Sequence, residues 1–187
     1  MAGSLLNIGL ETFETAVAVA SGWSGLGVIF VYSLLIAFVL PLPSEVVLLP
    51  VGYFGTANTL ALVPLPYEVQ VILVIVVSGA GKAVGSVIAL LVGYNASHSG
   101  PVIRGLRYLG FRPLEWSQRT LVRIGKRWGY LGMAMGLSVP FFPDTASIYA
   151  FSVIGNSYRK FAAAAFAGSV GRLLVTIALI EGALFVI

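Results

Sequence analysis

The sequence predicts an all-α polytopic membrane protein: an inverted repeat of two re-entrant, proline-broken helical hairpins, each followed by a transmembrane helix. Of its 187 residues 58% are hydrophobic and only 10% are charged, and the mean hydropathy is +0.98. This composition is typical of membrane proteins. Apolar stretches are long enough to cross about 30 Å of hydrocarbon. Prolines, glycines and a single cation recur in the same order in both halves, which indicates an internal repeat.

Two long apolar segments, 69–94 and 161–187, are predicted to span the bilayer. Each exceeds the roughly 20 residues that a spanning helix needs, and each has one cation near its middle, Lys82 or Arg172. A charge at that depth is costly, so it usually faces the protein interior and finds a partner. Small residues beside each cation allow another backbone to approach closely. They are Gly79, Gly81 and Gly85 in the first segment and Gly168 and Gly171 in the second.

Prolines break the segments that precede these helices. The stretch 23–62 runs into Pro41-Leu42-Pro43-Ser44-Glu45, and 129–155 runs into Pro140-Phe141-Phe142-Pro143-Asp144-Thr145. Proline lacks a backbone donor and clashes with the preceding turn, so a helix ends there. Each segment is therefore predicted to form a re-entrant hairpin with its tip at membrane depth. The serine and threonine at the tips are candidate caps for the half-helices that follow.

The charges at membrane depth allow a functional and a structural interpretation. Non-helical backbone is tolerated there only where it is buried in protein or lines a water-filled cavity. Glu45 and Asp144 on such backbone therefore indicate a transport pathway lined by charged groups. Acids close to hydrocarbon also bind protons more readily than acids in water. Opposite Lys82 or Arg172, a half-helix N-terminus would suit an anion or phosphate. The structural alternative is a set of static ion pairs. On the functional hypothesis, each repeat packs its glycine face around the other's tip and offers its cation there.

The distribution of charge predicts the orientation in the membrane. The linker 95–128 carries seven cations (Arg104, Arg107, Arg112, Arg119, Arg123, Lys126 and Arg127) and the single acid Glu115. By the positive-inside rule this linker is cytoplasmic. One helix lies between the two hairpins, so the repeats have opposite orientations. The acids Glu11, Glu14 and Glu68 then fall on the outer side.

Two further segments are predicted to lie at the membrane surface. Residues 113–128 form an amphipathic helix, which anionic lipid headgroups would attract to the inner interface. A cytosolic protein partner or a purely topogenic role is left open for this helix. Residues 1–21 form an outer interfacial segment, or else pack on the helices. The charge distribution argues against a nucleic-acid partner, and a homo-oligomer is left open.

Three stretches resemble the DedA family of membrane proteins, also called VTT-domain or SNARE-associated proteins. They are Pro41 to Gly52, Gly79 to Tyr94, and Pro143 to Phe161, within a match over 28–180. The resemblance implies two facing re-entrant hairpins and lipid translocation. Bacterial relatives are linked to polyprenyl-phosphate recycling and proton-coupled phospholipid flipping, and eukaryotic ones to scrambling. Glu45 and Asp144 correspond to the tip acids.

The chain also departs from the family pattern. Many members carry two arginines around the second hairpin loop, where this chain has Pro140 and Ala146, and a second acid where Ser33 stands. Lys82 and Arg172 are candidates to take over the cationic role.

Three functions are weighed on this basis. A lipid flippase or scramblase of the plasma membrane is favoured, because it uses the opposed hairpins, the buried charges and the basic linker. The alternative is a proton- or ion-coupled transporter of a small polar or anionic solute. An enzyme acting on a lipid pyrophosphate is less favoured, because such chemistry usually needs clustered acids with a metal and each tip offers one acid. No cofactor or metal is predicted, and the chain has no cysteine.

Overall fold

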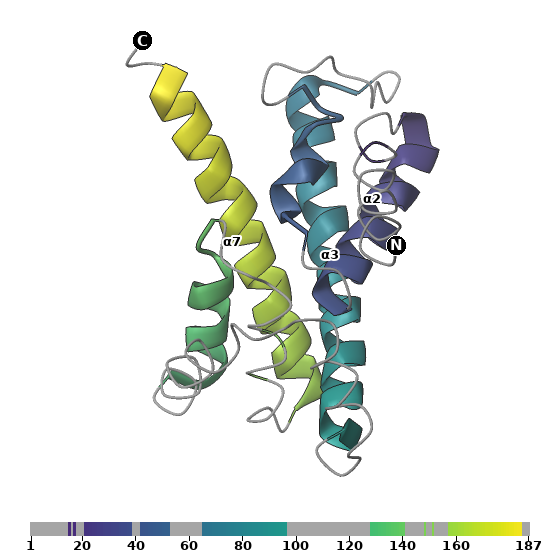
Figure 1. Cartoon of the computed structure of the whole chain (residues 1–187). Helices are drawn as coiled ribbons and strands as arrows, with labels where there is room; N and C mark the ends of the chain where they lie inside the picture. Colours follow the sequence, from purple (N-terminus) through teal and green to yellow (C-terminus); the bar gives the residue numbers. More distant parts are fainter. Residues whose placement is uncertain are drawn as a thin grey trace, which may run out of the picture.

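The computed structural model describes residues 15, 17, 21–38, 42–52, 65–96, 128–140, 148, 151 and 157–184. This part of the chain is all-α (Figure 1). Its labelled elements are α2 (Gly22–Phe38), the 3-10 helix η1 (Ser44–Leu48), α3 (Tyr67–Ala96) and α7 (Tyr158–Leu184). Residues 128–137 are also helical. Most of the predicted linker and of the N-terminal segment lies outside the described residues, as do 141–147, 149–150 and 152–155 of the second predicted hairpin.

The two predicted spanning segments are confirmed as long apolar helices. Tyr67–Leu91 within α3 and Tyr158–Ala183 within α7 are each long and apolar enough to cross a membrane. Their length is consistent with a membrane location. The α3 helix starts directly after Pro66, whose carbonyl accepts the backbone N–H of Val69 and of Gln70. The α2 helix ends at Phe38, shortly before Pro41, where proline disfavours further helix.

Glycines on α3 form a seam against α2. A Cβ added at Gly81 would lie 2.5 Å from the carbonyl oxygen of Phe30, and one at Gly85 would collide with the carbonyl oxygen of Leu34. Along the seam the residue numbers of α2 and of α3 increase in the same direction, so the two helices run parallel. Ser33 of α2 also donates a hydrogen bond of 2.8 Å to the Oγ atom of Ser78. Backbone thus packs on backbone, which only glycine permits here.

A second seam joins α7 to the helix at 128–137. A Cβ at Gly168 would lie 2.8 Å from the carbonyl oxygen of Ala134, and one at Gly171 would lie 2.6 Å from Oγ of Ser138. These two helices are therefore also parallel. At the start of α7, the backbone N–H of Ser157 donates to the Tyr130 hydroxyl at 2.9 Å.

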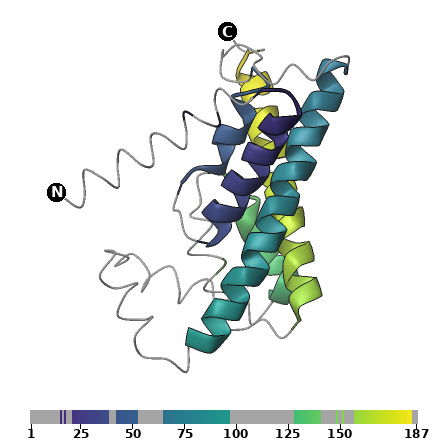
Figure 2. The same ribbon diagram turned by 90° about the vertical axis from the view of Figure 1, so that its right-hand side faces the viewer.

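The two parallel pairs meet through α3 and α7, which run in opposite directions (Figures 1 and 2). The crossing is close at Gly79, where a Cβ would lie 2.9 Å from the ring of Phe166 and 3.3 Å from Val170. Leu173 of α7 completes a core cluster with α2, η1 and the first half of α3. A second cluster joins the end of α2 and the second half of α3 to the helix at 128–137 and the start of α7.

The hypothesis that each glycine face packs around the other repeat's tip is wrong, because Gly79 meets α7 of the other repeat and not its tip, and the other four glycines meet neither. Gly81 and Gly85 contact α2, while Gly168 and Gly171 contact residues 134–138, so each pair lies against an earlier helix of its own half of the chain. The physical reason is their spacing. Small residues three or four positions apart form a straight groove on one helix face, which fits a neighbouring helix.

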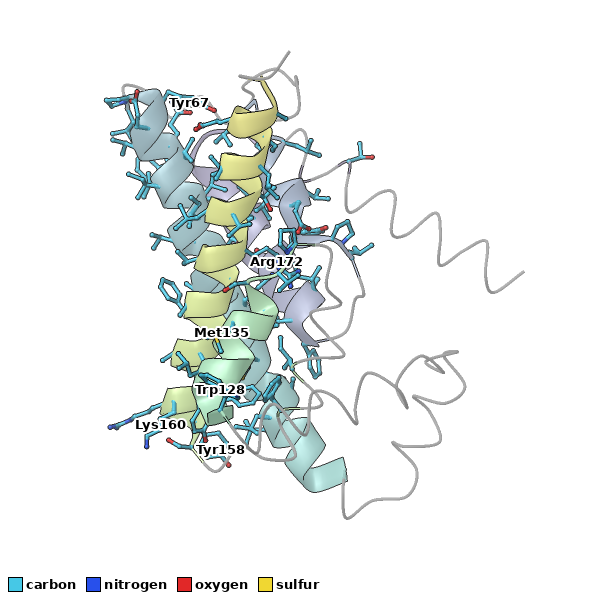
Figure 3. All side chains as sticks on the ribbon, turned by 90° about the vertical axis from the view of Figure 1, so that its left-hand side faces the viewer. Tyr67, Trp128, Met135, Tyr158, Lys160 and Arg172 are labelled. Atoms are coloured by element: carbon cyan, nitrogen blue, oxygen red, sulfur yellow. The ribbon has the colours of Figure 1, made fainter. Side chains whose placement is uncertain are left out.

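The two ends of the bundle differ in their exposed charges. Figure 3 shows Tyr67 at one end, Trp128, Tyr158 and Lys160 at the other, and Arg172 between them. We call these the Tyr67 end and the Tyr158 end. Among the described residues, exposed charges occur only near the ends. Acids lie at the Tyr67 end (Glu68 and Glu181), and cations lie at the Tyr158 end (Arg159 and Lys160).

Candidate functional site

Three of the four charged residues predicted at membrane depth are buried between the helices. The exposed fraction is 5% for Glu45, 3% for Lys82 and 2% for Arg172. The fourth, Asp144, lies outside the described residues, as do the tip residues Pro41, Pro143 and Thr145. Pro140 follows the end of the helix at 128–137 and is half-buried.

Arg172 joins two segments that end or begin inside the bundle. From the middle of α7 (Figure 3), its Nε donates a hydrogen bond of 2.8 Å to the carbonyl oxygen of Leu137. Its Nη1 donates to Oγ of Ser44 at 3.4 Å. Leu137 ends the helix at 128–137, and the last carbonyls of a helix carry partial negative charge and lack helical partners. The guanidinium therefore caps that helix and ties it to the start of η1.

The first predicted tip lies beside the middle of α2. The buried Tyr32 hydroxyl donates to the carbonyl oxygen of Pro43 at 2.9 Å. Pro43 is the residue before η1 and makes no side-chain cap. Ser44 is the first residue of η1, and its hydroxyl accepts a hydrogen bond from Arg172, not from a backbone N–H as the capping prediction required. The Ser44 hydroxyl therefore contacts Arg172, and no side-chain cap forms at the start of η1.

Lys82 lies on an α3 face with two buried serines. Ser78 is four residues before it and Ser86 four residues after it, so the three share one side of the helix. Ser78 accepts the hydrogen bond from Ser33, and Ser86 donates to the carbonyl oxygen of Ala83 at 2.7 Å. Both hydroxyls are thus satisfied within the protein. The Ser33 position, where the resembled family carries an acid, here holds a neutral hydrogen bond between α2 and α3.

Arg172 lies on a comparable face of α7. Ser169 precedes it by three residues, Thr176 follows it by four, and both are buried. Within the described part of the chain, neither hydroxyl oxygen has a hydrogen-bond partner. Leaving a buried hydroxyl in that state costs about 1 to 3 kcal/mol. We did not predict these two residues as site residues, although their spacing around Arg172 in the sequence places them on its face.

The two buried cations lie on opposite sides of the α3–α7 crossing. Lys82 is three residues beyond Gly79, toward the Tyr158 end, and Arg172 is beyond Val170, toward the Tyr67 end. With a rise of 1.5 Å per residue, the two positions are about 10 Å apart along the bundle. Among the described residues, each half of the bundle therefore contains one buried cation.

The described residues define an all-α chain with two helices of membrane-spanning length and with charged residues buried between its helices. Comparison with profiles of protein families, with curated proteins and with solved structures gives no significant match. The likeness to the DedA family therefore rests on the three stretches quoted above.

Proposed function

We propose that the chain is an integral membrane protein that moves lipids between the leaflets, as a flippase or scramblase of phospholipid or polyprenyl-phosphate type lipids. The observation that carries this proposal is the position of Arg172. Its guanidinium is buried midway along a helix of spanning length, where one helix ends and the segment containing Ser44 and Glu45 begins. Charged groups at that depth mark pathways for polar cargo.

The surface of the bundle supports a membrane orientation. Its exposed large hydrophobic residues lie along α2, α3, α7 and the helix at 128–137. Aromatic residues are exposed at both ends of the bundle. In membrane proteins, tryptophan and tyrosine are enriched at the two interfaces between membrane and water. Counted from the crossing at Gly79, Tyr67 and Tyr158 are about 33 Å apart along the bundle, close to the hydrocarbon thickness of about 30 Å. By the positive-inside rule, Arg159 and Lys160 favour a cytoplasmic position for the Tyr158 end.

The helix pairs support the inverted repeat. The pair α2–α3 and the pair formed by 128–137 and α7 are each parallel, each has a glycine seam, and the two pairs run in opposite directions. Each long helix carries a buried cation with hydroxyl residues about one turn away on either side. In membrane proteins of inverted-repeat topology, substrate sites lie between the repeats near the midplane.

This arrangement suggests how a lipid headgroup would cross. A phosphate in hydrocarbon pays a large desolvation cost, which a cation on the same path reduces. Lys82 and Arg172 supply one cation in each half of the bundle. Glu45, and Asp144 on the second predicted tip, would compete with the phosphate for these cations. Binding of a proton to the acid would release the cation for the phosphate, and this exchange would couple lipid movement to a proton gradient.

A second candidate is a proton- or ion-coupled transporter of a small anionic solute. The observation that favours it is the near-complete burial of Glu45, Lys82 and Arg172. A sealed site suits a small solute, whereas a lipid keeps its tails in the membrane and needs a lateral opening during transport.

Lipid movement in proteoliposomes tests the proposal. Fluorescent phospholipids and a polyprenyl phosphate are followed across the bilayer with and without a pH gradient. We expect the wild type to move at least one of them, and we expect Glu45→Gln, whose side chain cannot bind or release a proton, to abolish the effect of the pH gradient on the movement. Glu68→Gln, which changes an exposed acid at the Tyr67 end, is the matched control and is expected to behave like the wild type.

Absence of lipid movement by the wild type under both conditions would contradict the proposal. Uptake of small anions into the same vesicles would then test the second candidate.

A further inference from the structure

The buried polar face of α7 differs from that of α3 in one respect. On α3, Ser78 and Ser86 both have hydrogen bonds within the protein. On α7, Ser169 is 2% exposed and Thr176 is 5% exposed, and neither hydroxyl has a partner among the described residues. Buried polar groups are nearly always satisfied, so a hydroxyl without a partner among the described residues is a candidate position for contact with another molecule.

We propose that Ser169, Arg172 and Thr176 form a binding site for a phosphate oxyanion. An arginine guanidinium is a rigid fork of N–H donors that matches phosphate geometry, and hydroxyls add donors beside it. Arg172 lies in the middle of the bundle (Figure 3). Three buried groups on one helix face thus offer the chemistry that phosphate requires.

The spacing of the three residues indicates two adjacent positions for the phosphate. Along the axis of α7, Ser169 lies about 4.5 Å from Arg172 toward the Tyr158 end, and Thr176 lies about 6 Å from Arg172 toward the Tyr67 end. The two hydroxyls are too far apart for one phosphate to reach both. A phosphate shared between Arg172 and Ser169 would move about 5 Å, one turn along α7, to be shared between Arg172 and Thr176, keeping the guanidinium as a partner throughout. This site deepens the proposed function, and the step of the phosphate along α7 rests on that function.

Two sources of phosphate fit this chemistry, the headgroup of a lipid and free inorganic phosphate. Calorimetric titration of the purified full-length chain in non-ionic detergent distinguishes them. The ligands are dihexanoyl phosphatidic acid, inorganic phosphate and dihexanoylglycerol, which has the same tails but no phosphate. The variants are Ser169→Ala combined with Thr176→Val, and the control Ser86→Ala, whose hydroxyl is already bonded within its own helix.

We expect the wild type to bind a phosphate ligand and not dihexanoylglycerol. The double variant should bind about tenfold more weakly, because it loses hydroxyl bonds to a charged ligand, and Ser86→Ala should bind like the wild type. The melting temperature of the double variant should not fall, since it breaks no described hydrogen bond within the protein. Binding of phosphatidic acid alone would assign a lipid headgroup, and equal binding of inorganic phosphate would assign free phosphate.

The inference is overturned if no phosphate ligand binds, or if the double variant melts at a lower temperature but binds with unchanged affinity. Its failure is separable from failure of the proposed function. Lipid movement without phosphate binding here would remove the site and leave the function, whereas phosphate binding without lipid movement would leave the site and remove the function.

Discussion

Replacement of Arg172 by alanine is expected to lower the free energy of unfolding by about 3 to 5 kcal/mol. The side chain is almost fully buried, so its loss leaves a cavity. It also leaves the carbonyl of Leu137 and the hydroxyl of Ser44 without the donor that each now has. Unfolding in detergent, followed by the loss of helical circular dichroism, measures the effect.

Two further substitutions sharpen that test. Arg172→Lys keeps the charge but loses the planar fork, so its effect should be intermediate. Arg159→Ala removes an exposed arginine at the Tyr158 end and should change stability by no more than about 0.5 kcal/mol. Equal stability of Arg172→Ala and Arg159→Ala would show that the buried contacts of Arg172 contribute nothing.

Replacement of Gly85 by leucine is expected to destabilise the protein by about 3 kcal/mol or more. Even a single Cβ there would collide with the backbone carbonyl of Leu34 and crowd Ala37. Backbone cannot rotate away as a side chain does, so α2 and α3 must separate. The same unfolding assay measures the loss, and we expect Gly85→Ala to fall between leucine and the wild type.

Gly27 provides the matched control for the glycine seam. It lies within α2, and a Cβ at this position would have nothing within 4 Å. Gly27→Ala should therefore be neutral or stabilise by up to about 1 kcal/mol, because alanine favours helix over glycine. If Gly85→Ala and Gly27→Ala had the same effect, close packing of α2 on α3 would not depend on the seam.

The long helices were predictable because their signal is local. Length and hydropathy placed spanning segments at 69–94 and 161–187, and the helices occupy Tyr67–Ala96 and Tyr158–Leu184. The end of α2 before Pro41 follows from the chemistry of proline alone. That Lys82 and Arg172 would be buried followed equally from the cost of exposing a charge to lipid.

The partners of the site residues were not predictable in the same way, because they depend on how helices align. No local pattern indicates that Arg172 reaches Leu137 and Ser44. The two cations lie in opposite halves of the bundle because α3 and α7 cross at Gly79. The position of this crossing depends on how the helices pack and cannot be read from either helix alone. The spacing of Ser169 and Thr176 was visible in the sequence, but their burial without a partner was not.

We expect the Tyr67 end and the Tyr158 end to face opposite sides of a membrane. Because the chain has no cysteine, single cysteines can be introduced at exposed positions at either end by Glu68→Cys, Glu181→Cys and Lys160→Cys. A membrane-impermeant maleimide applied to intact cells should label the first two variants, and should label the third only after the membrane is opened. Labelling of all three from the same side would contradict the account.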